Sequence, residues 1–191
     1  LKVRIRLQVA GTWAGAQAKA QGRAVDGLAM GARHPKREVI YNPTDTLLAT
    51  YYSVFSENQS KINVNSFSEL DGLRIGYKKG ALPIKVMLEK LSSATLKPFE
   101  GSNEMITQAL LNNEIDVLVA WMSYDHWRKM RLQGTVEKIF IIDEHPQEMV
   151  THIRKDWPEL IPILNKAIVV LRKDELPRIV NKWFGEWPQR P

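Results

Sequence analysis

The side chains that could do chemistry in this chain are few and widely spaced. The chain has no cysteine, which excludes thiol catalysis, disulfides and cysteine-ligated metals. The histidines stand singly, at His34, His126, His145 and His152. Metal sites need clustered ligands, so we expect no metal site and no cofactor. Glu144 and His145 form an adjacent acid–base pair, but neighbours on a strand point to opposite faces. We therefore expect no catalytic residue and no enzymatic activity.

Groups that could bind an anion are easier to find. Arg37 lies in a basic turn with Arg33 and Lys36, and its planar guanidinium can donate two parallel hydrogen bonds to a carboxylate. The alternative is an ordinary surface arginine, and the residues alone leave both interpretations open. Gly80 and Ala81 precede a predicted helix, whose first N–H groups and dipole can receive an anion.

Composition limits the class of protein. With 44% hydrophobic and 25% charged residues, the 191-residue chain is typical of a folded globular protein. It is long enough for one large domain or two lobes. The 27 Lys and Arg against 21 Asp and Glu are spread along the whole chain, so no nucleic-acid partner is expected. No apolar run reaches the roughly 18 residues of a membrane span, so we expect no direct membrane insertion of this segment.

Strand and helix patterns alternate along the chain, which predicts an α/β fold with mainly parallel sheets. Val3, Ile5, Leu7 and Val9 alternate with polar residues and predict a first strand. Because the chain begins inside this pattern, we expect a fragment of a longer polypeptide. Thr12 and Gly22 are suited to cap a helix over 13–21. Further strands are expected at 25–30, 49–55, 73–77, 95–99, 117–120, 138–142 and 149–154, with helices over 83–91, 102–111, 124–133, 156–171 and 174–183, and a helical turn over 44–48.

The segment 18–30 has a partial echo at 107–121. Each has a small-residue helix, a polar turn, an Asp (Asp26 or Asp116) and a short apolar strand. This repetition indicates two similar lobes, with function in the cleft between them. At the strand starts the two aspartates are expected to serve turns rather than chemistry.

Five ordered segments resemble the family 3 extracellular solute-binding proteins. They are TW…VDGLAMGARHPKRE, FSELDGLRIGYKKGA, ALLNNEIDVLVA, IRKDWPELIPILNKAI and VNKWFGEW. The resemblance implies the type 2 periplasmic-binding-protein fold, which has two α/β lobes joined by a hinge. The fourth segment is also similar to Venus-flytrap sensor domains of membrane-bound histidine kinases and diguanylate cyclases. A bacterial periplasmic, extracytoplasmic location follows from the resemblance.

The resemblance predicts lobe 1 at 1–55 plus 148–191 and lobe 2 at 56–147. The resemblance implies that family members begin with a further strand and helix before the segment that matches Leu1, so we expect the first lobe here to lack its N-terminal strand and helix. An unpaired strand edge is a liability. We therefore expect a partner chain or a swapped element there, and a homo-oligomer is one option.

The ligand-binding residues implied by the resemblance are Trp13, Ala32, Arg37, Gly80, Ala81 and Trp121. Arg37 matches the arginine with which the family holds a ligand carboxylate. Ala32 and Ala81 stand where hydroxyl residues are common, which leaves only backbone donors. Trp13 matches a position lining the first-lobe side of the cleft, although a core role is equally open.

Trp121 is the sharpest departure from the family pattern. Amino-acid-binding members carry an Asp at this position, where it pairs with the ligand's ammonium group. An indole cannot neutralise that charge, so the expected ligand is a small organic anion without a standard α-amino group. The alternative is a tryptophan that fills an unused cleft, which would make the domain a degenerate module.

Taken together, the residues and the resemblance predict a module that closes on a solute and signals to a membrane-bound output domain. The alternative function is a free receptor that delivers its solute to the permease of an ABC importer of the amino-acid type. A less expected alternative is an enzyme on the same fold, since a few relatives are dehydratases, but that would require a convergent acid and base.

Overall fold

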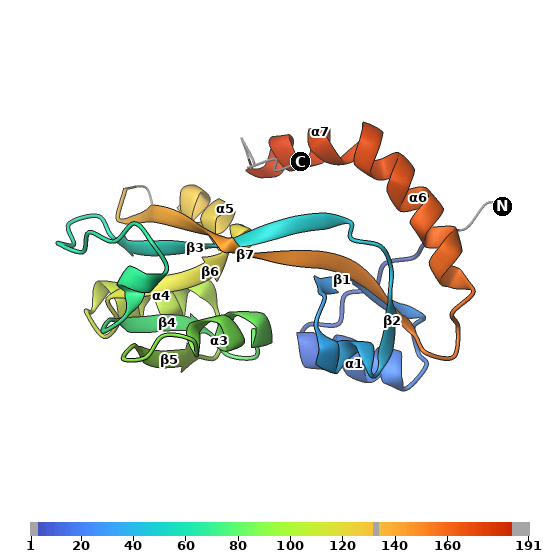
Figure 1. Cartoon of the computed structure of the whole chain (residues 1–191), viewed down its shortest axis with the longest axis horizontal. Helices are drawn as coiled ribbons and strands as arrows, with labels where there is room; N and C mark the ends of the chain where they lie inside the picture. Colours follow the sequence, from blue (N-terminus) through green and yellow to red (C-terminus); the bar gives the residue numbers. More distant parts are fainter. Residues whose placement is uncertain (1–3, 132–133, 185–191) are drawn as a thin grey trace. The chain divides into compact units, whose positions relative to one another are not determined.

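The computed structural model describes residues 4–131 and 134–184, and the chain divides into two compact units (Figure 1). Unit 1 consists of Leu1–Ala49 and Glu148–Asn181, and unit 2 of Thr50–Gln147 and Lys182–Pro191. Two strands, β3 (Leu48–Glu57) and β7 (Val136–Arg154), run across this division. The lobe limits expected from the sequence stay a prediction.

Unit 1 is built around the last residues of β7. Its other elements are α1 (Trp13–Gln21), β1 (Gly27–Ala32), α2 (Pro35–Glu38), β2 (Tyr41–Pro43) and α6 (Leu160–Asp174). Both β1 and β2 pair with β7 in antiparallel fashion, with His152 opposite Leu28 in one pair and opposite Pro43 in the other. The register of β1 shifts between Leu28 and Gly31. Because β7 has a neighbour on each edge, it is the central strand of this unit.

The predicted capping residues of α1 are confirmed. Thr12 Oγ1 accepts a hydrogen bond from the Gly15 N–H at 3.0 Å, and the Gly22 N–H bonds back to Ala18 O. A side-chain acceptor at the first turn satisfies a donor that the helix itself leaves unpaired. The helix packs through Ala20 against Leu28 of β1, and this contact places Trp13 at its N-terminal end near β1.

Unit 2 is a sheet with helices on both faces. Its remaining elements are the 3₁₀ helix η1 (Ser68–Leu70), β4 (Arg74–Lys78), α3 (Leu82–Leu88), β5 (Thr95–Phe99), α4 (Asn103–Leu111), β6 (Val117–Trp121) and α5 (Met122–Arg131). The strand order of the whole sheet is β1-β7-β3-β6-β4-β5. A further helix, α7 (Leu176–Phe184), crosses the division between the units near the end of the described chain.

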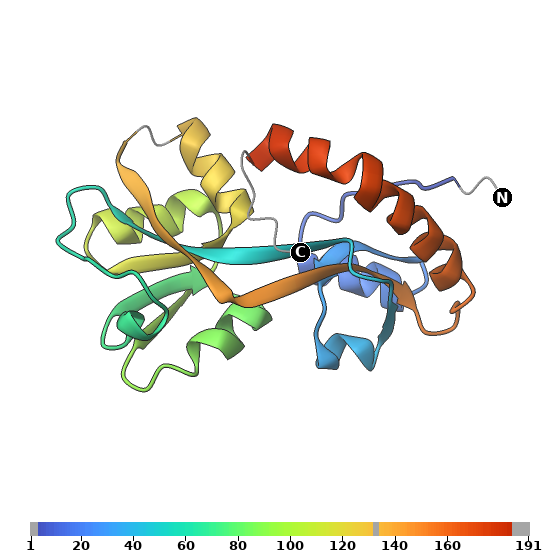
Figure 2. The ribbon, with the colours of Figure 1, turned by 45° about the horizontal axis from the view of Figure 1, so that its top comes forward.

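Alternate side chains of the β6 strand bury the two faces of the unit 2 sheet. Val117 and Val119 belong to a cluster that includes Leu88 of α3, whereas Leu118 belongs to a second cluster that includes Leu110 of α4. This alternation is the period-2 pattern of a strand that is buried on both faces. Figure 2 shows α3 on one side of the sheet and α4 and α5 on the other.

The strand predicted at the start of the chain is wrong. No strand is assigned to residues 4–10, and the side chains of Ile5, Leu7 and Val9 are 68%, 76% and 95% exposed; Val3 lies outside the described residues. Alternation alone does not make a strand, because the backbone groups need a neighbouring ladder. None of the described strands pairs with this segment.

Four smaller expectations also need correction. The sheets are not mainly parallel, since among the strand pairs of the described residues β4–β5 and β4–β6 are parallel, whereas β1–β7, β2–β7 and β3–β6 are antiparallel. The strands expected at 138–142 and 149–154 are one continuous strand, β7. Residues 44–48 form no helical turn, and the neighbouring short strand β2 and helix α2 were not foreseen. The helix expected from Asp156 starts at Leu160, since Asp156 is engaged in ion pairs with Arg23 and Arg154 instead.

Candidate functional site

The six predicted ligand-binding residues fall into two groups of three, one in each unit. In unit 1, Arg37 joins the other two directly. Its Nη1 donates a hydrogen bond to Ala32 O at 2.7 Å, and its Cζ lies 4.9 Å from the centre of the Trp13 ring. A cation over an indole face is attracted by the ring quadrupole. The guanidinium is therefore held in one orientation by a carbonyl and an aromatic face.

The local sequence explains where Arg37 stands. His34 caps α2, because its Nδ1 accepts a hydrogen bond from the Lys36 N–H at 3.2 Å, and Pro35 occupies the first turn. Proline suits this position since its missing N–H would have no partner in the helix. The short helix turns the chain so that Arg37 reaches back to the end of β1 at Ala32.

Gly31 allows Trp13 to lie against β1. A Cβ at this position would stand 2.8 Å from Trp13 Cη2 and 3.3 Å from Trp13 Cζ2, closer than such atoms approach. The same Cβ would stand 3.4 Å from His152 Cε1. The indole edge and the His152 ring therefore both lie close to the bare backbone of Gly31.

His152 also lies beside Gly31, although in the sequence it stands as an isolated histidine. Its side chain is fully buried, and neither ring nitrogen has a hydrogen-bond partner among the described residues. Its ring meets Tyr41 edge-on, with centroids 5.9 Å apart. Burial lowers the pKa of His152 to about 4, with further contributions from the positive charges of Arg37 and Arg33. The sequence could have indicated this burial, because His152 lies two residues after Val150 on the same strand and alternate side chains point to the same face.

Arg33, in the same basic turn as Arg37, is engaged in the fold of unit 1. Its Nε lies 2.8 Å from Glu148 Oε2, its Nη1 lies 3.7 Å from Glu38 Oε1, and its Nη2 donates to Thr44 O at 3.0 Å. These contacts connect the end of β1 to β7 and to the turn after β2. Arg33 is therefore a structural arginine.

In unit 2, Gly80 and Ala81 form the turn before α3 as predicted. Gly80 has a φ of +82°, which favours glycine, and a Cβ there would meet nothing within 4 Å. Ala81 is the N-cap of α3, and its side chain accepts no hydrogen bond from the first N–H groups of the helix. The neighbouring Lys79 is paired with Glu100. The turn therefore offers backbone groups rather than side chains. The helix that follows it, α3, has 7 residues.

Trp121 ends β6 and packs onto the core of unit 2. It lies opposite Tyr52 in the β3–β6 register, and the two rings stack with centroids 5.8 Å apart and planes inclined by 20°. Its Nε1 is buried and has no hydrogen-bond partner among the described residues. Ala81 packs against the same apolar cluster as Trp121. An unpaired buried donor of this kind costs about 1–3 kcal/mol.

The aspartates that open the two echoed strands have structural roles. Asp116 Oδ2 accepts a hydrogen bond from the Arg74 N–H at 2.7 Å, and the Arg74 guanidinium pairs with the same carboxylate. The hydrogen bond from the Arg74 side chain holds the pKa of Asp116 below its usual value. Asp26 O accepts a hydrogen bond from the Arg154 N–H at 3.2 Å.

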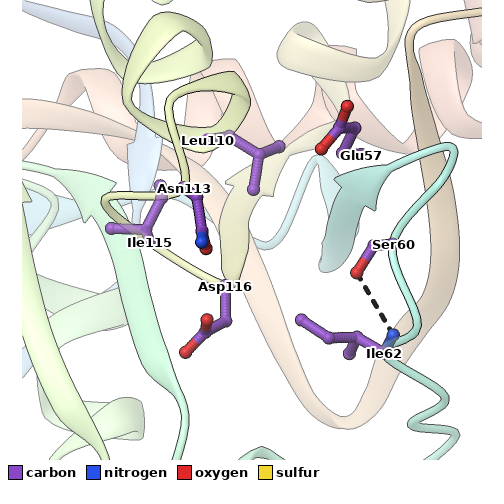
Figure 3. Close-up of a pocket in the computed structure, with 7 residues that line it drawn as sticks. All are labelled: Glu57, Ser60, Ile62, Leu110, Asn113, Ile115 and Asp116. Atoms are coloured by element: carbon purple, nitrogen blue, oxygen red, sulfur yellow. Dashed lines mark hydrogen bonds between the residues drawn. The ribbon is translucent and has the colours of Figure 1, made fainter.

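Figure 3 shows a pocket of unit 2 that contains none of the six predicted residues. It is lined by Glu57, Ser60, Ile62, Leu110, Asn113, Ile115 and Asp116. Its polar groups are largely engaged: Ser60 Oγ accepts from the Ile62 N–H, and Arg74 binds both Asn113 and Asp116. This pocket is a poor match for the predicted anion site because its lining is acidic.

The described residues contain neither a cluster of metal ligands nor a helix that could span a membrane. Residues 4–131 and 134–184 contain no group of three or more His, Asp or Glu placed to hold a metal ion. In the same ranges no helix has the length and apolar character to cross a membrane. The adjacent pair Glu144 and His145 lies within β7, where the His145 ring packs edge-on against Phe67.

The model for the bacterial extracellular solute-binding proteins, family 3, matches residues 1–186. The chain belongs to this family. The family assignment and the two-lobed fold expected from the sequence are thereby confirmed, as is the expected extracytoplasmic location.

Known relatives are similar to the chain at low identity. The virulence sensor protein BvgS of Bordetella bronchiseptica is 24% identical over 116 residues, which are 61% of this chain and 9% of that protein. The chain thus spans less than a tenth of that relative's length. The solved periplasmic domain of B. pertussis BvgS has a TM-score of 0.77 at 19% identity, covering 92% of this chain and 34% of that one.

A second solved structure is similar over a larger share of its own length. The ancestral amino acid-binding protein AncCDT-1, described as a precursor of cyclohexadienyl dehydratase, has a TM-score of 0.72 at 19% identity. The match covers 92% of this chain and 76% of that one. At such identities, these likenesses concern the fold.

Proposed function

We propose that this chain is an extracytoplasmic module that closes on a small carboxylate without a standard α-amino group. In this proposal the ligand carboxylate is bound by Arg37 in unit 1, and Trp13 contributes an aromatic surface beside it. The backbone at Ala32 and the turn at Gly80 and Ala81 supply further N–H donors. No metal, cofactor or catalytic residue takes part.

The observation that carries the proposal is the indole of Trp121, which the resemblance to the family matches to an Asp of amino-acid-binding members. An indole offers one donor, Nε1, and no acceptor. Its face is already stacked on Tyr52. An ammonium group brought to this position would find neither a counter-charge nor an acceptor from Trp121, and a buried unpaired charge is costly. A ligand group that accepts hydrogen bonds, such as a keto or carboxyl oxygen, suits Trp121 better.

The proposed output is signalling. The module closes around its ligand, and the preference of the ligand for the closed form limits the free energy passed to a membrane-bound output domain. The sensor assignment of BvgS supports this reading. The second candidate is a receptor for an ABC importer, which is favoured by the likeness to solved amino acid-binding proteins.

A thermal-shift screen tests the ligand class. The protein is melted with each of the common α-amino acids and with matched deaminated acids, such as phenylpyruvate beside phenylalanine and 2-oxoglutarate beside glutamate. We expect stabilisation by one or more deaminated acids, because binding to the folded state alone raises Tm. Arg37→Gln should abolish that stabilisation, whereas Arg178→Gln, which alters an exposed arginine paired with Glu175, should retain it.

A single substitution at Trp121 refines the test. Trp121→Phe retains the aromatic ring and removes only the indole N–H. If that N–H meets the ligand, the variant should bind the deaminated acid about five- to ten-fold more weakly, as expected for one hydrogen bond. Tight binding of ordinary α-amino acids by the unaltered protein would contradict the proposed ligand class. Failure of every acid to bind would favour the degenerate module.

A further inference from the structure

The pocket of unit 2 combines a buried apolar wall with a carboxylate that the fold does not use. Two of its lining side chains, Leu110 and Ile115, are 3% and 1% exposed and belong to a core cluster of the unit. Glu57, at the end of β3, forms no ion pair and no side-chain hydrogen bond within residues 4–131 and 134–184. Figure 3 shows Leu110 and Asn113 across the pocket from Ser60 and Ile62. The cavity has a volume of about 210 Å³.

The other polar groups of the lining leave an excess of negative charge. The charge of Asp116 is balanced by Arg74, whose Nη2 lies 2.5 Å from Asp116 Oδ1. No cation balances Glu57 within the part of the chain that the structure describes. Ser60 Oγ accepts a hydrogen bond from the Ile62 N–H at 3.1 Å, and a hydroxyl oxygen has a second lone pair with which it can accept another.

We propose that this pocket binds a primary alkylammonium group, either of a free small amine or at the end of a lysine side chain. An ammonium donates three hydrogen bonds and accepts none, so it matches the Glu57 carboxylate and the second lone pair of Ser60. Its methylene groups pack on Ile62, Leu110 and Ile115, as the stems of cationic side chains pack on apolar surface. The cavity is smaller than the roughly 300–1,000 Å³ of pockets for drug-sized ligands, so its occupant is small.

Other ligand classes fit the lining less well. An anion would meet the Glu57 carboxylate, while the nearby Arg74 is already paired with Asp116. A metal ion needs clustered ligands, and the described residues hold no group of three or more His, Asp or Glu placed to bind one. A neutral apolar molecule would leave the carboxylate without a partner. An alkylammonium group uses both the charge and the apolar wall.

The pocket is separate from the residues of the proposed carboxylate site. Asp116 immediately precedes β6, and Trp121 is the last residue of that strand. At about 3.3 Å per residue, the two lie about 16 Å apart along the strand. An amine in the pocket therefore does not compete with a ligand at Trp121, and the inference does not rest on the proposed function.

NMR titration of the whole chain with n-butylammonium chloride at constant ionic strength tests the site. We expect saturable shifts of the backbone amide resonances of Ser60, Asn113 and Asp116, and no such shifts with n-butanol, which has the same apolar body without the charge. Glu57→Gln should weaken binding at least about ten-fold, as expected for loss of a hydrogen bond to a charged group. Glu137→Gln removes an exposed carboxylate outside the pocket and should leave the affinity unchanged.

A second titration, with lysine capped at both its amino and carboxyl groups, distinguishes the two sources of the ammonium. Equal affinity for capped lysine and n-butylammonium would mean that the side chain of a peptide can enter the pocket, whereas binding of n-butylammonium alone would identify a free amine. The proposal is overturned if n-butylammonium causes no shifts at the pocket, if n-butanol causes equal ones, or if Glu57→Gln binds n-butylammonium as tightly as the unaltered protein.

Discussion

At the scale of single residues, Gly31 decides whether Trp13 and Arg37 can meet. The Cβ of any other residue would come within 2.8 Å of the indole. Gly31→Ala should therefore move Trp13 and with it the guanidinium above it. Overpacking of this kind destabilises by about 1–3 kcal/mol. We expect a shifted Trp13 indole N–H resonance and weaker binding of any carboxylate that binds the unaltered protein.

Gly72→Ala is a suitable comparison for this change. Gly72 lies in unit 2 with a φ of +80°, and a Cβ there would meet nothing within 4 Å. The variant carries backbone strain of its own but leaves the surroundings of Trp13 intact. An unchanged Trp13 resonance in Gly31→Ala would contradict the proposed role of the glycine.

The resemblance to the family located Trp13, Ala32 and Arg37 in the sequence, and the structure shows these three in contact. It did not locate Gly31 or His152. These two meet only because β1 pairs with β7 in one register, with an irregularity between Leu28 and Gly31. Such pairing joins residues that are distant in the chain, and the pattern of neighbouring residues in the sequence does not predict it.

At the scale of elements, a buried ion cluster joins α5 to the first part of β7. Asp125 Oδ1 accepts from Arg128 Nη2 at 2.7 Å, and Asp125 Oδ2 accepts from Lys138 Nζ at 3.1 Å. The Asp125 side chain is only 11% exposed. Arg128 Nη1 also donates to Val136 O at 2.7 Å. Removing the carboxylate would leave Arg128 buried without its counter-charge.

Asp125→Ala should therefore lower the free energy of unfolding by about 3 kcal/mol, as for other broken buried ion pairs. Glu175→Gln, which breaks an exposed pair with Arg178, should change it by less than about 1 kcal/mol. Urea denaturation at pH 7 measures both. Equal effects would show that the buried cluster contributes no more than a surface pair.

The same cluster has a predictable pH dependence. Burial alone would raise the pKa of Asp125, but the hydrogen bonds from Arg128 and Lys138 with the nearby positive charges outweigh it and lower the pKa. A lowered carboxyl pKa stabilises the fold above the ordinary value of about 3.9 and loses that effect as the pH falls through the folded-state pKa. The loss of stability below pH 4 should be smaller in Asp125→Ala.

Elements with strong local signals were predictable. Thr12 and Gly22 cap α1 as expected, and α4 and β5 lie close to their predicted positions. The continuity of β7 was not predictable, because Pro146 interrupts its pattern and proline usually marks a strand end. The strand expected near the N-terminus was wrong for the opposite reason. Its apolar–polar alternation is typical of a strand, but none of the described strands pairs with it.

At the scale of the whole molecule, the two units differ in their buried cores. The apolar cluster of unit 1 consists of Ala20, Leu28 and Tyr41, whereas unit 2 has two larger clusters on the two faces of its sheet. Because apolar burial is the main stabilising contribution, unit 2 should be the more stable. Native-state hydrogen exchange should show stronger protection in β3, β4 and β6 than in β1 and β2. Stronger protection in unit 1 would contradict this ranking.

The position of β7 in unit 1 also sets the order in which the chain can fold as it is made. β1 ends at Ala32, but the strand that it pairs with begins to reach it only at Met149. At synthesis rates of roughly 5–20 residues per second, β1 waits on the order of ten seconds for its neighbour. Unit 2 lies between them in one nearly continuous stretch and can form first. The contact group of Trp13, Ala32 and Arg37 is then one of the last parts of the molecule to be completed, and the edge strand β1 is exposed to chaperones and to misassembly until then.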